Sequence, residues 1–312
     1  MDSKNKTLAT ELFLIGFSRD LKINRALFAL FLGIYLITFM GNVLIFCVVL
    51  ISPHLHTPMY FFLCILASLD LCISTTVVPR MLSDLISFKN PISIGACNLQ
   101  CFTILLLSGT ESLLLALMAY DRYAAICCPL RYPILMRWSL CYELTAFVWI
   151  LSFIILIIPP LFVPVVLCNP NQVNHFMCEV LAVIRLACAS IDSSKIIMFL
   201  TCFVALLLPF MFIIISYICI LFSILKIHST GRSKAFSTCT SHITVVAFYY
   251  GTAINMYFGP STEYSVHQGK YLSLFSHVIC PTLNPIIYSL NNKEVKAAQR
   301  KLKTKIICAL GD

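Results

Sequence analysis

Seven long apolar runs restrict this chain to one class of structure. A helix that crosses the hydrocarbon core of a bilayer needs about 20 apolar residues. Runs of roughly this length recur at residues 26–51, 59–86, 98–119, 143–166, 196–225, 239–258 and 271–290. Backbone groups in lipid must bond internally, so helices fit these runs, and the short alternating segments of a β-barrel are not found. The sequence predicts an all-α membrane protein, a seven-transmembrane helix bundle.

Composition and motifs narrow the function. Only 11% of the 312 residues are charged, whereas soluble domains average about 25%. We divide the chain into an N-terminal tail (1–25), the bundle (26–290) and a C-terminal tail with a short amphipathic helix (291–312). No connecting segment has room for a catalytic domain, and GxxxxGK[ST], HExxH and GxSxG motifs are absent. We expect no enzyme activity and no nucleic-acid partner.

Basic residues set the expected orientation. Cytoplasmic loops are rich in Lys and Arg. The residues that place one side in the cytoplasm are Arg131, Arg137, Lys226, Arg232, Lys234, Lys293, Lys296, Arg300, Lys301, Lys303 and Lys305. The basic N-terminal tail argues the other way, but the sequon at Asn5 is glycosylated only in the lumen. We expect a plasma-membrane protein with its N-terminus outside and its C-terminus in the cytoplasm.

Four of the 16 cysteines lie in loops on the expected outer side: Cys97, Cys168, Cys178 and Cys188. An even set on an oxidising face predicts two disulfides, with three pairings open and free thiols as the alternative. The stretch HFMCE at 175–179 could instead hold a metal ion, but a disulfide-bonded cysteine cannot also be a ligand. We therefore expect no metal site.

A few polar residues interrupt the apolar runs. Asp70 and Glu111 lie near the middle of the second and third runs, and Asn42 and Asn284 lie in the first and seventh. Ionisable groups at this depth cost about 2.5–3.5 kcal/mol, so they suggest function. They could line a hydrated cavity that holds a sodium ion or a water network near Asp70 and Glu111, or they could only join helices by hydrogen bonds.

Prolines mark stretches of weakened helix. They fall at Pro159, Pro160, Pro164, Pro209, Pro281 and Pro285. Each removes one backbone hydrogen bond and favours a kink. Asn284 directly precedes Pro285, so a polar side chain lies beside weakened backbone, which is a place for motion or for a static kink.

Asp121 and Arg122 stand together at the end of the third run, in MAYDRYAAIC (118–127). An arginine at a helix end can extend toward the cytoplasmic interface while the neighbouring carboxylate holds it, and a contact with two states can act as a lock. The alternative is a pair that only fixes the depth of the helix.

Five stretches in order carry a family resemblance. They are LHTPMYFFL (55–63), MAYDRYAAIC (118–127), SY (216–217), KAFSTCTSH (234–242) and PTLNPIIYSLNNKEV (281–295). Over nearly its whole length the chain resembles an olfactory receptor of the rhodopsin-like (class A) G-protein-coupled receptors, of the tetrapod type. It departs from the frequent pattern at Tyr249, Arg80 and Asn291.

The resemblance implies roles for several residues. Asp121-Arg122-Tyr123 is the receptor switch, in which the arginine moves from its aspartate toward Tyr217 and Tyr288. Helix anchor positions match Asn42, Asp70, Trp149, Pro209, Asn284, Pro285 and Tyr288. The implied disulfides are Cys97–Cys178 and Cys168–Cys188. The implied partner is a heterotrimeric G protein of the stimulatory, olfactory type, which raises cAMP.

The resemblance also places a small volatile ligand in the outer half of the bundle. Helical spacing then selects the wall. Its expected members are Ile104, Leu105, Ser108, Ser112, Thr201, Ala205, Tyr250, Ala253, Ile254, Tyr257 and His277. An apolar wall with a few hydroxyls suits a hydrophobic, sparingly polar ligand. No Asp or Lys faces inward at that level, so we expect no salt bridge to an amine.

A transporter or channel is the rival interpretation, because intramembrane carboxylates and kinked helices also mark ion pathways. The chain shows no internal repeat, and its number of helices is odd. The basic C-terminal tail predicts a short helix along the anionic inner leaflet, with Val295, Leu302 and Ile306 on its apolar side.

Overall fold

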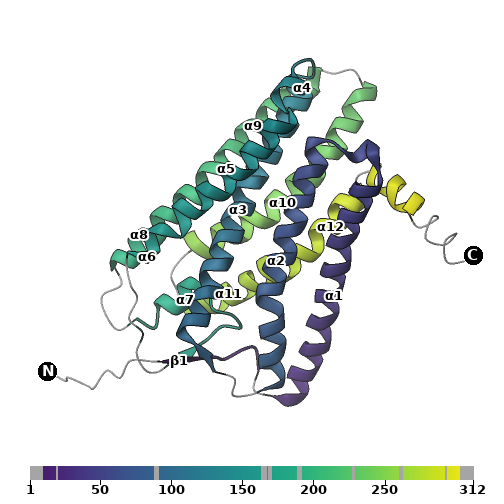
Figure 1. The fold of residues 1–312 in the computed structure, drawn as a ribbon. Helices are drawn as coiled ribbons and strands as arrows, with labels where there is room; N and C mark the ends of the chain where they lie inside the picture. The colour runs from purple at the N-terminus through teal and green to yellow at the C-terminus, as the bar shows by residue number, and fades with distance from the viewer. Residues whose placement is uncertain are drawn as a thin grey trace, which may run out of the picture.

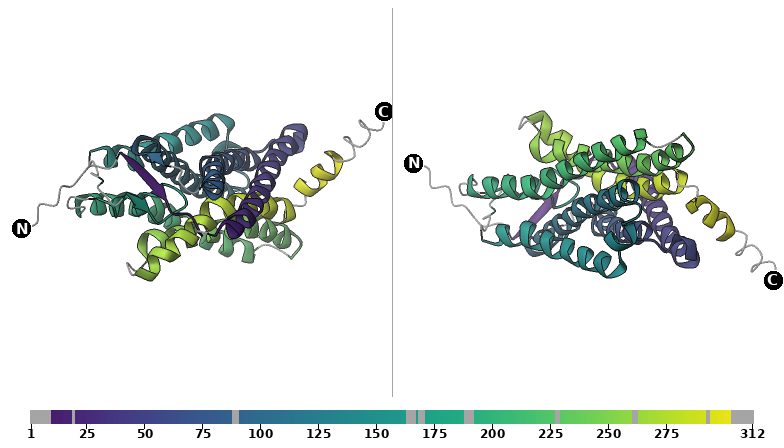
Figure 2. Two further views of the ribbon diagram at one scale, coloured as in Figure 1. Left: turned by 90° about the horizontal axis from the view of Figure 1, so that it is seen from below. Right: turned by 90° about the horizontal axis from the view of Figure 1, so that it is seen from above.

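Helical rods packed side by side form the molecule (Figures 1 and 2). The computed structural model describes residues 10–18, 20–87, 91–162, 167, 171–187, 192–226, 229–259, 263–291 and 294–302. Over these residues the rods are α1 (Leu21–Ile51), α2 (Pro58–Ile86), α3 (Ile94–Cys127), α5 (Trp138–Leu156), α8–η2–α9 (Asp192–Cys202, Phe203–Leu207, Leu208–Lys226), α10 (Ser229–Phe258) and α11–η3–α12 (Glu263–Leu274, Phe275–Ile279, Cys280–Asn291). Short elements join them: η1 (Pro53–Leu55), α4 (Tyr132–Leu135), α6 (Ile158–Leu161) and α7 (Val180–Ile184).

Five helices in the described residues are long and apolar enough to cross a membrane: Leu21–Ile51, Pro58–Ile86, Ile94–Cys127, Trp138–Leu161 and Ile196–Lys226. The rods α10 and α11–η3–α12 fall short because they carry more polar residues, such as His242, Asn255 and His277. By hydropathy alone, the count of seven apolar spans is met only in part.

The rods differ in how much of their surface is buried in the core of the bundle. In α3, 67% of the most apolar stretch is buried, against 22% in the α5 region, so α3 runs through the middle of the bundle. Large apolar side chains remain exposed on the outer faces of α1, α5 and α9, for example Met40, Ile150 and Phe222. Exposed apolar bands on long helices are typical of contact with lipid.

Several helix ends differ from the sequence prediction. The helix α3 begins at Ile94, where the Ser93 hydroxyl accepts from the Ala96 amide (3.2 Å), and continues to Cys127, eight residues past the predicted end. The helix α1 begins five residues early, and α10 ten residues early. The fourth rod begins at Trp138 and breaks at Ile157, before Pro159 and Pro160, so the predicted start at residue 143 was wrong. Residues 163–166, where the predicted range ends, lie outside the described residues.

The described C-terminal residues 294–302 are helical and amphipathic, as expected. Val295 and Ala298 are buried, whereas Lys296, Arg300 and Lys301 are exposed. The Tyr60 hydroxyl donates to Glu294 Oε2 (3.0 Å) and ties this helix to α2. The predicted apolar residue Ile306 lies outside the described residues.

A small sheet at the opposite end was missed by sequence analysis. The strand β1 (Glu11–Leu14) pairs antiparallel with β2 (Ile92–Ser93) and parallel with β3 (Gln172–Val173), with Leu12 opposite Ile92 and Leu14 opposite Val173. Leu12 is fully buried among Cys97, Cys178 and Val173. Strands this short leave no periodic signal, and their partners are distant in sequence.

One predicted disulfide is confirmed. Cys97 at the start of α3 bonds Cys178 in the loop after β3, with 5.4 Å between the Cα atoms. Cys168 and Cys188 lie outside the described residues, as does Asn5. The residues just before those two cysteines, Leu167 and Ala187, form an antiparallel bridge.

We predict that Cys97→Ser and Cys178→Ser each lower the free energy of unfolding by about 4 kcal/mol, because the bond closes a loop with a sequence separation of 81 residues. Thermal unfolding of the purified protein measures the loss, and Cys72→Ser, at an exposed free cysteine, is the control. The double variant should lose no more than either single one; a clearly additive loss would contradict the shared bond.

Candidate functional site

Ser112 on α3 joins three rods. Its hydroxyl donates to the Ala205 carbonyl (2.7 Å) and lies 2.9 Å from the Tyr250 hydroxyl. Pro209 has no N–H to donate to the carbonyl four residues earlier, which is that of Ala205. The Tyr250 hydroxyl in turn donates to the Ser112 carbonyl (2.9 Å). This contact therefore holds α3, the fifth rod and α10 together.

A small cavity of about 40 Å³ lies beside this contact, on the side toward the small sheet. Six of the eleven residues predicted for the ligand wall line it: Leu105, Ser108, Ala205, Ala253, Tyr257 and His277. The volume suits about one water molecule rather than an organic ligand. A ligand must therefore displace side chains of this wall to fit.

The other five predicted wall residues do not line the cavity. Ile104 packs with Phe176, Met177 and Val278 nearer the end of the bundle. Thr201 donates to carbonyls of its own helix, Ile197 (2.9 Å) and Met198 (3.0 Å). Ile254 packs against the central hydrophobic cluster. Ser112 and Tyr250 are the contact described above.

Sequence analysis missed Gly109, Leu156, Cys202, Leu206, Tyr249, Met256 and Ser276, which also line the cavity. Tyr249, noted only as a departure from the family pattern, donates its hydroxyl to the Ser108 carbonyl. Gly109 was the one signal in the sequence for this part of the wall. A Cβ at position 109 would collide with the Leu156 side chain, so only glycine fits there. A glycine inside a buried helix signals such a close approach.

Glu179 brings a carboxylate to the outer end of the site. The disulfide at Cys178 fixes its position, as does the Cys178 amide, which donates to Gln100 Oε1 (2.8 Å). Glu179 Oε2 accepts from the Ala182 amide (2.9 Å) and caps α7, while Oε1 has no hydrogen-bond partner in the described residues. Burial raises the pKa of Glu179.

The Glu179 carboxylate acts electrostatically on Tyr257 and Cys202, two residues of the cavity wall. The expectation that no Asp or Lys faces inward at this level concerned the helices only, and it did not consider Glu179, a loop residue positioned by a disulfide. Glu179 does not itself line the cavity, so its carboxylate lies behind the wall.

Below the cavity, polar side chains connect the rods. Asn284 Nδ2 donates to both carboxylate oxygens of Asp70 (3.1 Å each). Asn42 Nδ2 donates to the Pro281 carbonyl (3.0 Å), which lies four residues before Pro285 and lacks its helical donor. Glu111 is buried and interacts electrostatically with Asp70. We find no hydrogen bond to the Glu111 side chain among the described residues.

Asp121 and Arg122 form an ion pair, with Arg122 Nε 3.0 Å from Asp121 Oδ2. The Tyr132 hydroxyl donates to Asp121 Oδ1 (2.8 Å). Because α3 continues to Cys127, the pair lies within the helix, and the Arg122 side chain is only 14% exposed. The neighbouring carboxylate holds the arginine as predicted, but the pair lies within α3 and not at its end.

The predicted partners of Arg122 surround it without bonding to it. The Tyr217 hydroxyl lies 2.7 Å from His242 Nδ1, and the two rings are stacked. Tyr288 has no hydrogen-bond partner for its buried hydroxyl in the described part of the chain. Arg122 acts electrostatically on both tyrosines. Tyr123, the third residue of the motif, packs beside Ile220 and Cys239.

Comparison with known proteins agrees with this arrangement. The family model described as olfactory receptor matches residues 31–305. Human olfactory receptor 2A12 is 42% identical over 96% of this chain and 98% of its own length. Human olfactory receptor 10R2 is 43% identical over 97% and 91%. The dog olfactory receptor-like protein OLF3 is 44% identical over 97% and 96%.

We predict that Asp70→Leu destabilises the protein by about 1–3 kcal/mol, because it leaves the buried amide of Asn284 unpaired. Thermal unfolding of Asp70→Leu, Asn284→Leu and the double variant measures the coupling between them. The double variant should lose less than the sum of the single losses by at least ~0.5 kcal/mol. Simple additivity would show that the contact contributes nothing.

Proposed function

Because the chain belongs to the olfactory receptor family, whose members are receptors and not enzymes, we propose that it is an odorant receptor. It binds small, mostly hydrophobic volatile ligands in the outer half of the bundle. It then activates a heterotrimeric G protein of the stimulatory, olfactory type and raises cAMP. The observation that carries the proposal is a set of three polar contacts in the bundle of a family member: Ser112 with Ala205 and Tyr250, Asp70 with Asn284, and Asp121 with Arg122.

In this proposal all seven rods cross the plasma membrane, with the N-terminus outside. Exposed Arg131, Arg137 and Lys226 lie at one end, where basic residues are expected on the cytoplasmic side. The Cys97–Cys178 disulfide and the small sheet lie at the other, where an oxidising environment suits the bond. Asn5 is glycosylated there, and Cys168 bonds Cys188, since their neighbours Leu167 and Ala187 already pair.

The ligand widens the cavity of about 40 Å³ beside Ser112, which we call the inner cavity. Apolar residues such as Leu105 and Ala253 accept its hydrocarbon part, while Ser108 and His277 offer polar groups. Glu179 does not line the closed cavity, and its Oε1, which has no hydrogen-bond partner in the described residues, reaches the ligand once the wall moves. The ligand separates Tyr249 from the Ser108 carbonyl, because the wall must move to make room. Since Tyr250 is the next residue of α10, that shift also acts on the Ser112 contact and moves α10 relative to α3.

The inner ends of the helices carry the response. Movement of α10 takes His242 away from Tyr217, and the freed Tyr217, with Tyr288, receives Arg122 from Asp121. The inner ends of α3, α9 and α10 then open toward the G protein. A sodium ion or a water network near Asp70 and Glu111 belongs to the resting state, where carboxylate oxygens offer ligands suited to it.

We predict that Arg122→Ala abolishes ligand-dependent cAMP without loss of surface staining, because the switch then has no cation to transfer. The measurement uses an N-terminal epitope on intact cells, together with cAMP recorded against a broad panel of volatile compounds. The matched control is Arg131→Ala, an exposed arginine on the same side. A normal response from Arg122→Ala, or an epitope found inside the cell, would contradict the proposal.

We also predict that Glu179 sets ligand preference. Agonists with an O–H or N–H donor should lose about 3–10-fold in potency on Glu179→Ala, whereas agonists without a donor should be unaffected. Glu179→Gln keeps an acceptor and should fall between the two. Ser108→Leu, which fills the cavity, is the matched comparison and should weaken both ligand classes. Equal losses for both classes on Glu179→Ala would exclude a recognition role.

A further inference from the structure

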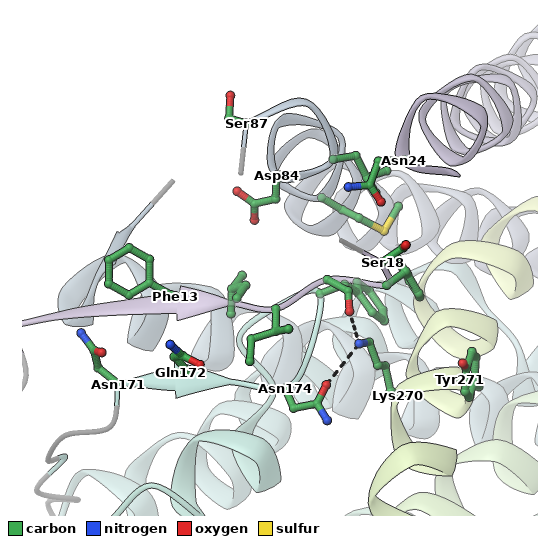
Figure 3. A pocket seen from close by; sticks show the side chains of 17 residues that line it. Phe13, Ser18, Asn24, Asp84, Ser87, Asn171, Gln172, Asn174, Lys270 and Tyr271 are labelled. Carbon is green, nitrogen blue, oxygen red and sulfur yellow. Dashed lines mark hydrogen bonds between the residues drawn. The ribbon is translucent and has the colours of Figure 1, made fainter. Parts of the chain in front are cut away.

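A second and larger cavity lies at the end of the bundle that carries the sheet. Its volume is about 760 Å³, within the range of small-molecule sites. It is walled by β1 and the residues after it, the start of α1, the end of α2, the β3 region and α11 (Figure 3). This outer cavity shares no lining residue with the inner one.

The charged groups of the outer cavity are already matched. Lys270 Nζ donates to the Gly16 carbonyl and to Asn174 Oδ1 (3.3 Å), and it lies 5.3 Å from the centre of the Phe17 ring. Asp84 Oδ2 pairs with Arg80 Nε at 3.0 Å. A charged ligand would have to displace one of these partners, so the wall favours a neutral molecule.

The wall includes a buried amide oxygen that lacks a donor. Asn24, in the first turns of α1, is only 3% exposed, and its Oδ1 has no hydrogen-bond partner among the described residues. Figure 3 shows it across the cavity from Lys270 and Asn174. A buried acceptor without a donor costs about 1–3 kcal/mol. A ligand that donates to it would recover that loss.

Apolar side chains form much of the remaining wall. Phe17 stacks on Phe176 with ring centres 5.2 Å apart, and Met81 and Leu85 of α2 are buried beside them. Phe176 also packs with Ile104 and Met177, which continue inward as one cluster. The wall also carries polar side chains, among them Asn171, Gln172 and Asn174. The apolar patch beside the Asn24 acceptor suits a neutral molecule that has a hydrocarbon body and a donor group.

We propose that the outer cavity is a second binding site, separate from the inner cavity, for a neutral and largely apolar molecule whose O–H or N–H group donates to Asn24 Oδ1. The site does not depend on the signalling function, because none of its residues belongs to the switch. It is tested by occupancy rather than by cAMP.

The test measures labelling of Ser87→Cys, at an exposed residue of the cavity wall, by a charged, water-soluble methanethiosulfonate. The receptor is purified, and labelling of the unchanged protein is subtracted. The probes are n-octanol and its isomer n-heptyl methyl ether, which lacks the donor. We expect n-octanol to slow labelling at about 3–10-fold lower concentration than the ether. Thr10→Cys, exposed but outside the cavity wall, should be unaffected.

Two further variants locate the binding. Added to Ser87→Cys, Asn24→Leu should remove the preference for n-octanol, whereas Ser108→Leu in the inner cavity should leave it unchanged. If Asn24→Leu does not fold, Leu14→Trp, which fills the outer cavity, should abolish protection by either probe. Equal or absent protection by the two probes, a preference that survives Asn24→Leu, or one that is lost with Ser108→Leu would overturn the proposal.

Discussion

The architecture depends on donors for backbone carbonyls that proline leaves without partners. In lipid no water can satisfy such a carbonyl, so a neighbouring helix must do so. Ser112 of α3 donates to the carbonyl of Ala205, four residues before Pro209, and Asn42 of α1 donates to that of Pro281, four residues before Pro285. Each irregular stretch of helix is thereby fixed to a particular neighbour.

These two contacts lie next to other residues of the candidate site. The Ser112 contact lies at one end of the small cavity. The Asn42 contact lies beside Asn284 of α12, which pairs with Asp70 of α2. Tyr288, one turn further along α12, has a hydroxyl without a hydrogen-bond partner in the described residues, and Arg122 acts on it electrostatically. Under the proposed function, a cavity of about 40 Å³ together with a paired Arg122 corresponds to the resting receptor.

Much of this was predictable from sequence, since apolar runs and prolines act locally. The runs gave the rods, and the prolines gave the break near Ile157 and the irregular stretches η2 and η3. The ends of α3 and α10 were missed because polar residues continue a helix beyond the membrane without any apolar signal. The strand β1 was missed because it is stabilised by partners distant in the chain.

The candidate site shows the same division. Helical spacing found the wall residues that face inward, such as Leu105 and Tyr257. It misplaced Ile104, whose side chain packs against Phe176, nearer the end of the bundle that carries the sheet. Glu179 could not be found by periodicity, because a disulfide and a helix cap position it.

The central claim is that a volatile ligand acts through these contacts on a G protein. Nucleotide exchange on a purified stimulatory G protein, with the receptor in lipid nanodiscs, tests it most directly. The account predicts faster exchange with at least one compound of a broad volatile panel; exchange that stays at the basal rate with every compound, on folded receptor, would contradict it.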